Sequence, residues 1–373
     1  MTFQGGSPPP SAARLPEPGW LPDPARTDLE RYWDGWSWTS RTRDRVSKIE
    51  RVLYNPSAYN PAPWAPAKPK RRSRLGPLLA LLAVVLVAYG VLGYMGRLPA
   101  SAPYAQQLEQ EPPVASDVAY PVFGSTELVQ HLARAMVAQE QSIDVSYWMT
   151  VQGVSESELS DALLEVSAQN PYIYANAWTV VTQGPKVWVE PEYTYSDSDA
   201  EGRRAATQAV VTSSLASLGI TAATPARDAV KAIHDFIARQ ATYDHTAYEE
   251  ITADAAATSP RIDQSQEAYG ILVAGTAVCN GYAKAFQAMA QAAGLQSVIV
   301  TGTATGLTTG SHAWNRVLVD GEWLTVDVTW DDGDSQGPTR YDYFLVDNNA
   351  AVLGTRFADA DWVVDSNLGN YGA

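Results

Sequence analysis

The chain has 373 residues, of which 46% are hydrophobic, a formal net charge of −15 and a single cysteine. This composition suits one or two globular domains and excludes collagen-like and wholly disordered chains. One thiol can form neither an intramolecular disulfide nor a cysteine-rich zinc site, so disulfide-stapled scaffolds and zinc fingers are excluded as well.

The first 17 residues are predicted to be disordered, and residues 18–43 form a different kind of segment. Four tryptophans gather there, and Asp34-Gly35 favours a tight hairpin turn between two aromatic strands. We interpret residues 18–43 as a small Trp-rich module. Its PGW, PDP and YWDG…W pattern resembles a short domain of unknown function found at the N-termini of actinobacterial membrane proteins. The resemblance implies no chemistry, and a tryptophan cluster that is itself the core is the favoured interpretation.

Residues 44–74 are predicted to be a basic Pro-rich linker, and residues 75–96 (LGPLLALLAVVLVAYGVLGYMG) carry no charge. Twenty-two apolar residues match the roughly 20 needed to cross a bilayer, so this segment predicts a transmembrane helix. A buried core helix is the first alternative. A cleaved signal peptide is the second, since residues 100–102 (ASA) resemble a cleavage site, but the apolar run is longer than the usual h-region of about 7–15 residues.

Charge is distributed unevenly about this span. Residues 1–74 carry 13 Lys+Arg and 7 Asp+Glu (+6), whereas residues 98–373 carry 12 and 34 (−22). Because cationic flanks stay in the cytoplasm, we expect a single-pass protein of the cell membrane with a cytoplasmic N-terminus and an extracellular acidic domain. The acidity of that domain argues against nucleic acid as a partner.

The region after the span is predicted to begin with a linker, residues 97–121, followed by an α+β lead-in region, residues 122–224. Helices are expected over 125–141, over 155–171 with a Ser155–Glu158 capping box, and over 196–217 as an exposed helix. Strands are expected in YIYANAWTVV and KVWVEPEYTY. Another helix should start at Thr224-Pro225 and open the last domain, residues 225–373.

Cys279 lies in GTAVCNGYAKAF, where an apolar run gives way to a helical pattern that ends near Gly294. The thiol should therefore sit at a helix N-terminus. The helix dipole and the unpaired N–H groups stabilise a thiolate there, and the same groups can hold an oxyanion.

A base for this thiol is suggested by the hairpin in SHAWNRVLVDGEWLTVDVTW, which turns at Asp320-Gly321. If Val319 faces Glu322, then Trp314 faces Asp327 and His312 faces Thr329. His312 and Asp327 are then diagonal neighbours on one sheet face, and a slip of one residue would separate them. Of the other histidines (His131, His234 and His245), His245 is the one rival for the role of base.

Residues 226–348 resemble the bacterial transglutaminase-like superfamily, a group of papain-like thiol enzymes. The segments AIHDFIARQATYDH, AYGILVAGTAVCNGYAKAF, HAWNRV, GEWLTVDVTWDDG and YDYFLVD occur in the family's order. The resemblance implies an α+β papain-like core, in which the nucleophile-bearing helix packs on an antiparallel sheet. It also implies Cys279 as nucleophile, His312 as general base and acid, and Asp327 as the group that orients the imidazole. Tyr269 would line the oxyanion site or pack.

The sequence thus predicts a membrane-anchored thiol enzyme that acts on amide bonds of a protein or peptide through a thioester, by acyl transfer, deamidation or hydrolysis. A domain outside an actinobacterial-type cell would meet cell-wall peptides and secreted proteins. The alternatives are a non-catalytic extracellular binding domain on the same fold and a membrane sensor whose Trp-rich module recruits a cytoplasmic partner. No cofactor and no metal are expected, because Asp331, Asp332 and Asp334 are explained as solvated turn carboxylates.

Overall fold

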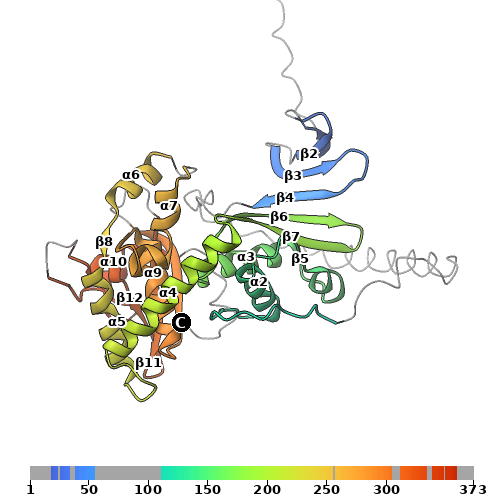
Figure 1. Ribbon diagram of the computed structural model, residues 1–373. Coiled ribbons are helices and arrows are strands. Elements are labelled where there is room, and N and C mark those ends of the chain that lie inside the picture. Colours follow the sequence, from blue (N-terminus) through green and yellow to red (C-terminus); the bar gives the residue numbers. More distant parts are fainter. Residues whose placement is uncertain are drawn as a thin grey trace, which may run out of the picture.

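The structure is a computed structural model that describes residues 18–23, 26–33, 38–54, 111–254, 257–304, 311–333, 338–347 and 349–358. Figure 1 shows a sheet-rich lobe and a helix-rich lobe, with α4 (Asp197–Ser217) running between them. Each lobe has its own hydrophobic core. The described part of the chain therefore has the mixed α+β architecture that the sequence predicts.

The first lobe is a seven-stranded sheet in the order β1-β2-β3-β4-β6-β7-β5. Helices α2 and α3 pack together beside β6 and β7, and their apolar faces form one core with these strands. The elements of this lobe are β1 (Gly19–Pro22), β2 (Leu29–Trp33), β3 (Trp38–Asp44), β4 (Glu50–Tyr54), α2 (Glu127–Val137), β5 (Ile143–Asp144), the π-helix η2 (Tyr147–Val151), α3 (Glu156–Gln169), β6 (Ala175–Gln183) and β7 (Lys186–Tyr193).

The local signals of the lead-in region give the expected elements. Both predicted strands form, as β6 and β7, and α3 starts with the complete Ser155–Glu158 capping box. The helix predicted over residues 196–217 forms as α4, but it is not exposed throughout. Val211 and Leu215 are buried where α4 packs against α8 and α9 of the second lobe, and Arg204 is buried where its Nε donates to the carbonyl of Tyr172 (2.9 Å).

The N-terminal strands extend beyond the predicted module. Strands β2 and β3 pair antiparallel with Trp33 opposite Trp38, and the predicted Asp34-Gly35 turn lies outside the described residues. Strand β4 falls in the range predicted to be linker, and that part of the prediction is wrong. Five residues of β4 pair with β6, and Arg51 forms an ion pair of 2.8 Å with Glu190.

The predicted transmembrane helix, residues 75–96, lies outside the described residues, as do residues 1–17 and most of both predicted linkers. Within the part of the chain that the structure describes, no helix combines the length and the apolar character needed to cross a bilayer.

The second lobe packs helices on a four-stranded sheet of order β12-β11-β10-β13. Its central helix is α9, whose residues 281–290 are all buried between that sheet and helices α4, α5 and α8. The elements are α5 (Ala226–Gln240), β8 (Thr242–Tyr243), α6 (His245–Ala253), α7 (Pro260–Ser265), α8 (Ala268–Leu272), β9 (Thr276–Ala277), α9 (Cys279–Ala292), β10 (Ser297–Ala304), β11 (Ser311–Val319), β12 (Glu322–Val326), α10 (Val328–Asp331), the 3-10 turn η3 (Ala351–Leu353) and β13 (Arg356–Ala358).

Candidate active site

Cys279 is the first residue of α9, as predicted, and its side chain is half-buried. The first N–H groups of a helix lack intrahelical acceptors, so they surround this thiol with donors and the positive end of the helix dipole. The close seat of this turn depends on Gly281. A Cβ at that position would lie 2.6 Å from the carbonyl oxygen of Ser265 and 2.5 Å from the Cβ of Ala277. Only glycine lets the helix start so near to α7 and β9.

The hairpin that carries His312 has the predicted register. Asn315 to Val319 face Val326 to Glu322 in order, across a turn in which Asp320 and Gly321 both have positive φ (54° and 87°). The pairing stops at Val326, so the predicted His312–Thr329 pair does not form. Asp327 instead caps the short helix α10 by accepting a bond from the N–H of Trp330 (3.1 Å).

His312 contacts both predicted partners. Its Nε2 lies 2.6 Å from Oδ2 of Asp327, and the Cys279 thiol is close enough to the imidazole to help raise the pKa of His312. Because Nε2 faces Asp327, Nδ1 is the ring nitrogen left for the thiol. His312 and Asp327 are 3% and 1% exposed, so little water competes for these bonds. The structure therefore brings Cys279, His312 and Asp327 together, with His312 contacting both of the others.

The buried groups of this site shift one another's pKa values. Burial by itself would lower the pKa of His312, but the Asp327 carboxylate, assisted by the thiol, raises it to about 9. Burial would likewise raise the pKa of Asp327, and the charges and hydrogen bonds of His312 and Arg356 lower it overall. At neutral pH these shifts favour an imidazolium beside an ionised carboxylate.

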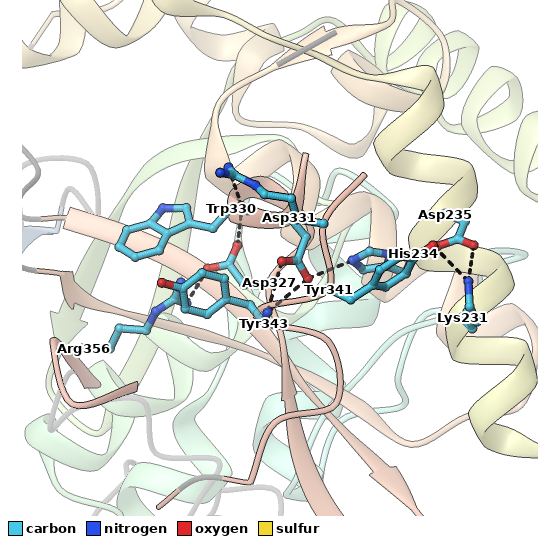
Figure 2. A network of polar contacts seen from close by, with 10 residues as sticks. Lys231, His234, Asp235, Asp327, Trp330, Asp331, Tyr341, Tyr343 and Arg356 are labelled. Carbon is cyan, nitrogen blue, oxygen red and sulfur yellow. Dashed lines mark hydrogen bonds and ion pairs between the residues drawn. The ribbon is translucent and has the colours of Figure 1, made fainter. Parts of the chain in front are cut away.

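Arg356, on β13, is a site residue that sequence reasoning missed. Its Nη1 donates to Oδ2 of Asp327, the same oxygen that His312 contacts, and the side chain is 2% exposed. The guanidinium lies over the rings of Trp330 and Tyr343, with its carbon 4.1 and 4.3 Å from the ring centres (Figure 2). No motif in the local sequence marks this arginine, because β13 has only three residues.

Aromatic rings flank His312 and Cys279. The imidazole stacks on Trp314 (5.8 Å between ring centres) and lies tilted against Trp330 (5.1 Å). Tyr243 is also close to the thiol: burial first and then the charge of Cys279 raise the pKa of this phenol. The parallel pair β8–β9 brings it there, by placing Tyr243 opposite Ala277. Neither tryptophan nor Tyr243 was predicted to line the site.

Three sequence-based interpretations have different outcomes. Tyr269 lies on α8 with the Arg203 guanidinium 4.4 Å from its ring centre, so its oxyanion role stays a prediction. His245 packs edge-on against Tyr243, and it is His312 that contacts Asp327.

The interpretation of the acidic turn as solvated is wrong. Asp331 is fully buried, and Asp332, which is 6% exposed, accepts a hydrogen bond of 2.6 Å from Tyr282. Asp334 lies outside the described residues.

A second histidine–carboxylate pair, His234 and Asp331, lies at the other end of α10 from Asp327. His234 of α5 is fully buried, and its Nε2 is 3.1 Å from Oδ2 of Asp331, the last residue of α10 (Figure 2). Its Nδ1 is 3.1 Å from Asp235, which also accepts bonds from Lys231 (2.6 Å) and Tyr341 (3.0 Å). Sequence reasoning treated His234 only as a poorer candidate for the base. Among the described residues, no group of three or more His, Cys, Asp and Glu side chains is placed to hold a metal ion.

Two family models match parts of the chain. Residues 213–328 match the Transglutaminase-like superfamily. The matched segment is about a third of the chain and contains Cys279, His312 and Asp327. It starts inside α4, earlier than the predicted boundary at residue 225. Residues 18–52, which include β1 to β3 and part of β4, match a second family, described as a protein of unknown function (DUF2510).

Similar individual proteins cover smaller parts of the chain. The Kyphoscoliosis peptidase of Mus musculus is 42% identical over 64 residues, which is 15% of this chain and 10% of that protein. The Homo sapiens protein of the same name is 36% identical over 92 residues, or 22% of this chain and 14% of its own. The chain thus spans only a small fraction of these relatives' length.

Two solved structures share low overall similarity with the chain. A crystal structure of a TGase has a TM-score of 0.31 and 18% identity, and the match covers 44% of this chain and 46% of that one. The structure of a putative cysteine protease from Cytophaga hutchinsonii has a TM-score of 0.27 and 14% identity, over 49% and 56% of the two chains.

Proposed function

We propose that the protein is a thiol enzyme that cleaves or exchanges amide bonds through Cys279, His312 and Asp327. The observation that carries the proposal is one buried imidazole that contacts the Asp327 carboxylate at 2.6 Å and interacts with the Cys279 thiol. A nucleophile, a base and an orienting group in this order are the components of acyl transfer by thiol enzymes. The transglutaminase-like match over the same residues supports it.

The proposed reaction starts with attack of the Cys279 thiolate on an amide carbonyl, which forms a carbon–sulfur bond and an oxyanion. N–H groups at the start of α9 are placed to stabilise that charge. The His312 imidazolium then gives its proton to the amine as the carbon–nitrogen bond breaks, leaving a thioester. Water or a second amine attacks the thioester, loses a proton to His312 and releases Cys279 as the thiolate, which restores the starting ion pair. Water gives hydrolysis or deamidation, and an amine gives cross-linking.

The substrate class that we propose is a protein or peptide amide. Active-site labelling tests the reaction without knowing the natural substrate. The full chain in detergent is incubated with a glutamine-mimicking peptidyl electrophile and measured by intact-mass spectrometry. Since Cys279 is the only cysteine, wild type should gain one adduct. Cys279→Ser should gain none, and His312→Ala should be slowed by about 100-fold or more.

One outcome of this experiment would reject the enzyme, and a second would reject the probe. If His312→Ala reacts as fast as wild type, Cys279 is only an accessible thiol and the non-catalytic binding domain is the better account. If folded Cys279→Ser still gains the adduct, the electrophile does not report on this site.

We further propose that residues 75–96 anchor the protein in a membrane, with residues 1–74 in the cytoplasm and the acidic remainder outside. The charge-free sequence and its cationic N-terminal flank support this proposal. The pairing of β4 with β6 is relevant to this membrane topology, because β4 precedes the apolar segment in the sequence and β6 follows it.

A further inference from the structure

We propose that His234 and Asp331 are positioning residues, which hold the short helix α10 so that Asp327 at its start faces His312. This inference rests on the proposed function. It concerns a pair of side chains that contact neither Cys279 nor His312 in the interactions described above, and it assigns a role in catalysis to the network in Figure 2.

Helix α10 is too short to hold its own position. It has four residues, Val328–Asp331, and one turn of helix has too few internal hydrogen bonds to be stable without tertiary contacts. Asp327 caps its start, and the N–H of Asp331 donates to the carbonyl of Asp327 (3.2 Å). Any rotation of this turn therefore moves the Asp327 carboxylate relative to His312.

Asp331 fixes the other end of the turn. Its carboxylate lies 3.1 Å from His234 Nε2 and accepts from the N–H of Tyr343 (3.0 Å). The carbonyl of Tyr343 in turn accepts from the N–H of Asp327 (3.1 Å). One residue of the 338–347 segment thus connects the Asp331 carboxylate to the backbone of Asp327.

His234 is itself held in place by aromatic and polar contacts. It is fully buried on α5, stacks on Tyr341 (5.4 Å between ring centres) and meets the edge of Phe344 (5.1 Å). Asp235 holds its second nitrogen, and Lys231 and Tyr341 hold Asp235. Helix α5 packs on α9, so the network links the helix that carries the thiol with the turn that carries Asp327.

The test measures iodoacetamide alkylation of Cys279 in the full chain at pH 6 and pH 9.5. At pH 6 a fast reaction requires the thiolate–imidazolium pair, which Asp327 supports, whereas at pH 9.5 an ordinary thiol is largely ionised without help. We expect His234→Phe to reduce the ratio of the rate at pH 6 to the rate at pH 9.5 about tenfold, because a displaced Asp327 carboxylate stabilises the imidazolium less. His234→Gln keeps a donor for Asp331 and should restore most of the ratio.

The matched control is His131→Phe. His131 is a buried imidazole of the first lobe, with one nitrogen 3.1 Å from the carbonyl of Asp144 and its ring stacked 4.8 Å from Trp148. Its replacement removes a buried histidine without touching α10, so the rate ratio should stay at the wild-type value. A structural effect alone would lower the melting temperature in both variants and leave both ratios unchanged.

The other outcomes distinguish failure of the positioning role from failure of the enzyme proposal. If His234→Phe has the same ratio as His131→Phe, the positioning role is wrong, and the enzyme proposal is untouched as long as wild type depends on His312. If wild type itself reacts slowly at pH 6 and His312→Ala does not change that rate, both proposals fail. If His234→Phe does not fold, Asp331→Asn serves instead, because it keeps an acceptor for Tyr343 and removes the carboxylate from His234.

Discussion

Asp327 accepts two cationic donors on one carboxylate oxygen, His312 and Arg356. A buried carboxylate with one cationic partner is balanced only while that partner stays charged, and imidazolium loses its charge when it gives up a proton. Arginine keeps its charge throughout the ordinary pH range. Arg356 therefore compensates the charge of Asp327 at the moment when His312 is neutral in the proposed reaction.

The raised pKa of His312 predicts how stability depends on pH. The folded-state pKa is about 9 against an ordinary value of 6.5, so the folded state binds this proton more tightly than the unfolded chain. The stabilisation is complete below about pH 6.5 and is lost as the pH rises through 9. Urea unfolding at pH 6, 7.5 and 9.5 should show wild type losing more stability with rising pH than His312→Gln does. Parallel curves for the two proteins would contradict the ion pair.

Helix α9 depends on its glycine as much as on its cysteine. Gly281 lets the first turn lie against the backbone of residues 265–267 and the Cβ of Ala277. The side chains of the following residues, Tyr282 to Ala290, are buried on every side of the helix. The helix thus cannot shift away from an added methyl group without disturbing both the sheet and α5.

Two helical glycines provide a matched pair for a prediction at this scale. Gly281→Ala should lower the melting temperature and slow labelling of Cys279, because its Cβ would meet the carbonyl oxygens of Ser265 and Glu267 at 2.6 and 3.0 Å. Gly202→Ala on α4 should raise the melting temperature, since its Cβ would meet nothing within 4 Å and alanine is favoured over glycine in helices by about 1 kcal/mol. Equal effects of the two substitutions would refute the close-packing argument.

The parts of the site that could be predicted are those with local signals. The Asp320-Gly321 turn and strict alternation gave the register of β11 and β12, and hence the proximity of His312 and Asp327. The helix pattern after Cys279 gave the start of α9. Arg356 is 29 residues from Asp327 in the sequence, and His234 is 97 residues from Asp331. Contacts between such distant residues leave no local signal, so only the folded chain shows which buried charges meet.

At the scale of the whole molecule, the β4–β6 ladder and the predicted transmembrane helix exclude one another. The ladder pairs residues 50–54 with 178–182, so both strands must be on one side of any bilayer. A single span at residues 75–96 would put them on opposite sides. During synthesis the apolar segment emerges about 80 residues before β6, so it can insert before the partner strand of β4 exists. We therefore expect the membrane-inserted protein to lack the ladder and to leave this edge of β6 open.

An engineered cysteine pair decides between the two arrangements. Val52 faces Val180 in the ladder, and opposed residues of antiparallel strands are about 5 Å apart at Cα, which suits a disulfide. We expect Val52→Cys with Val180→Cys, in a Cys279→Ser background, not to cross-link in membranes. The same pair should cross-link when a Gly-Ser linker replaces residues 75–96, because the strands then share one compartment. Val52→Cys with Gln183→Cys, three residues out of register, is the control that should cross-link in neither protein. A disulfide in the membrane-bound full chain would show that the ladder persists and that residues 75–96 do not cross the bilayer once.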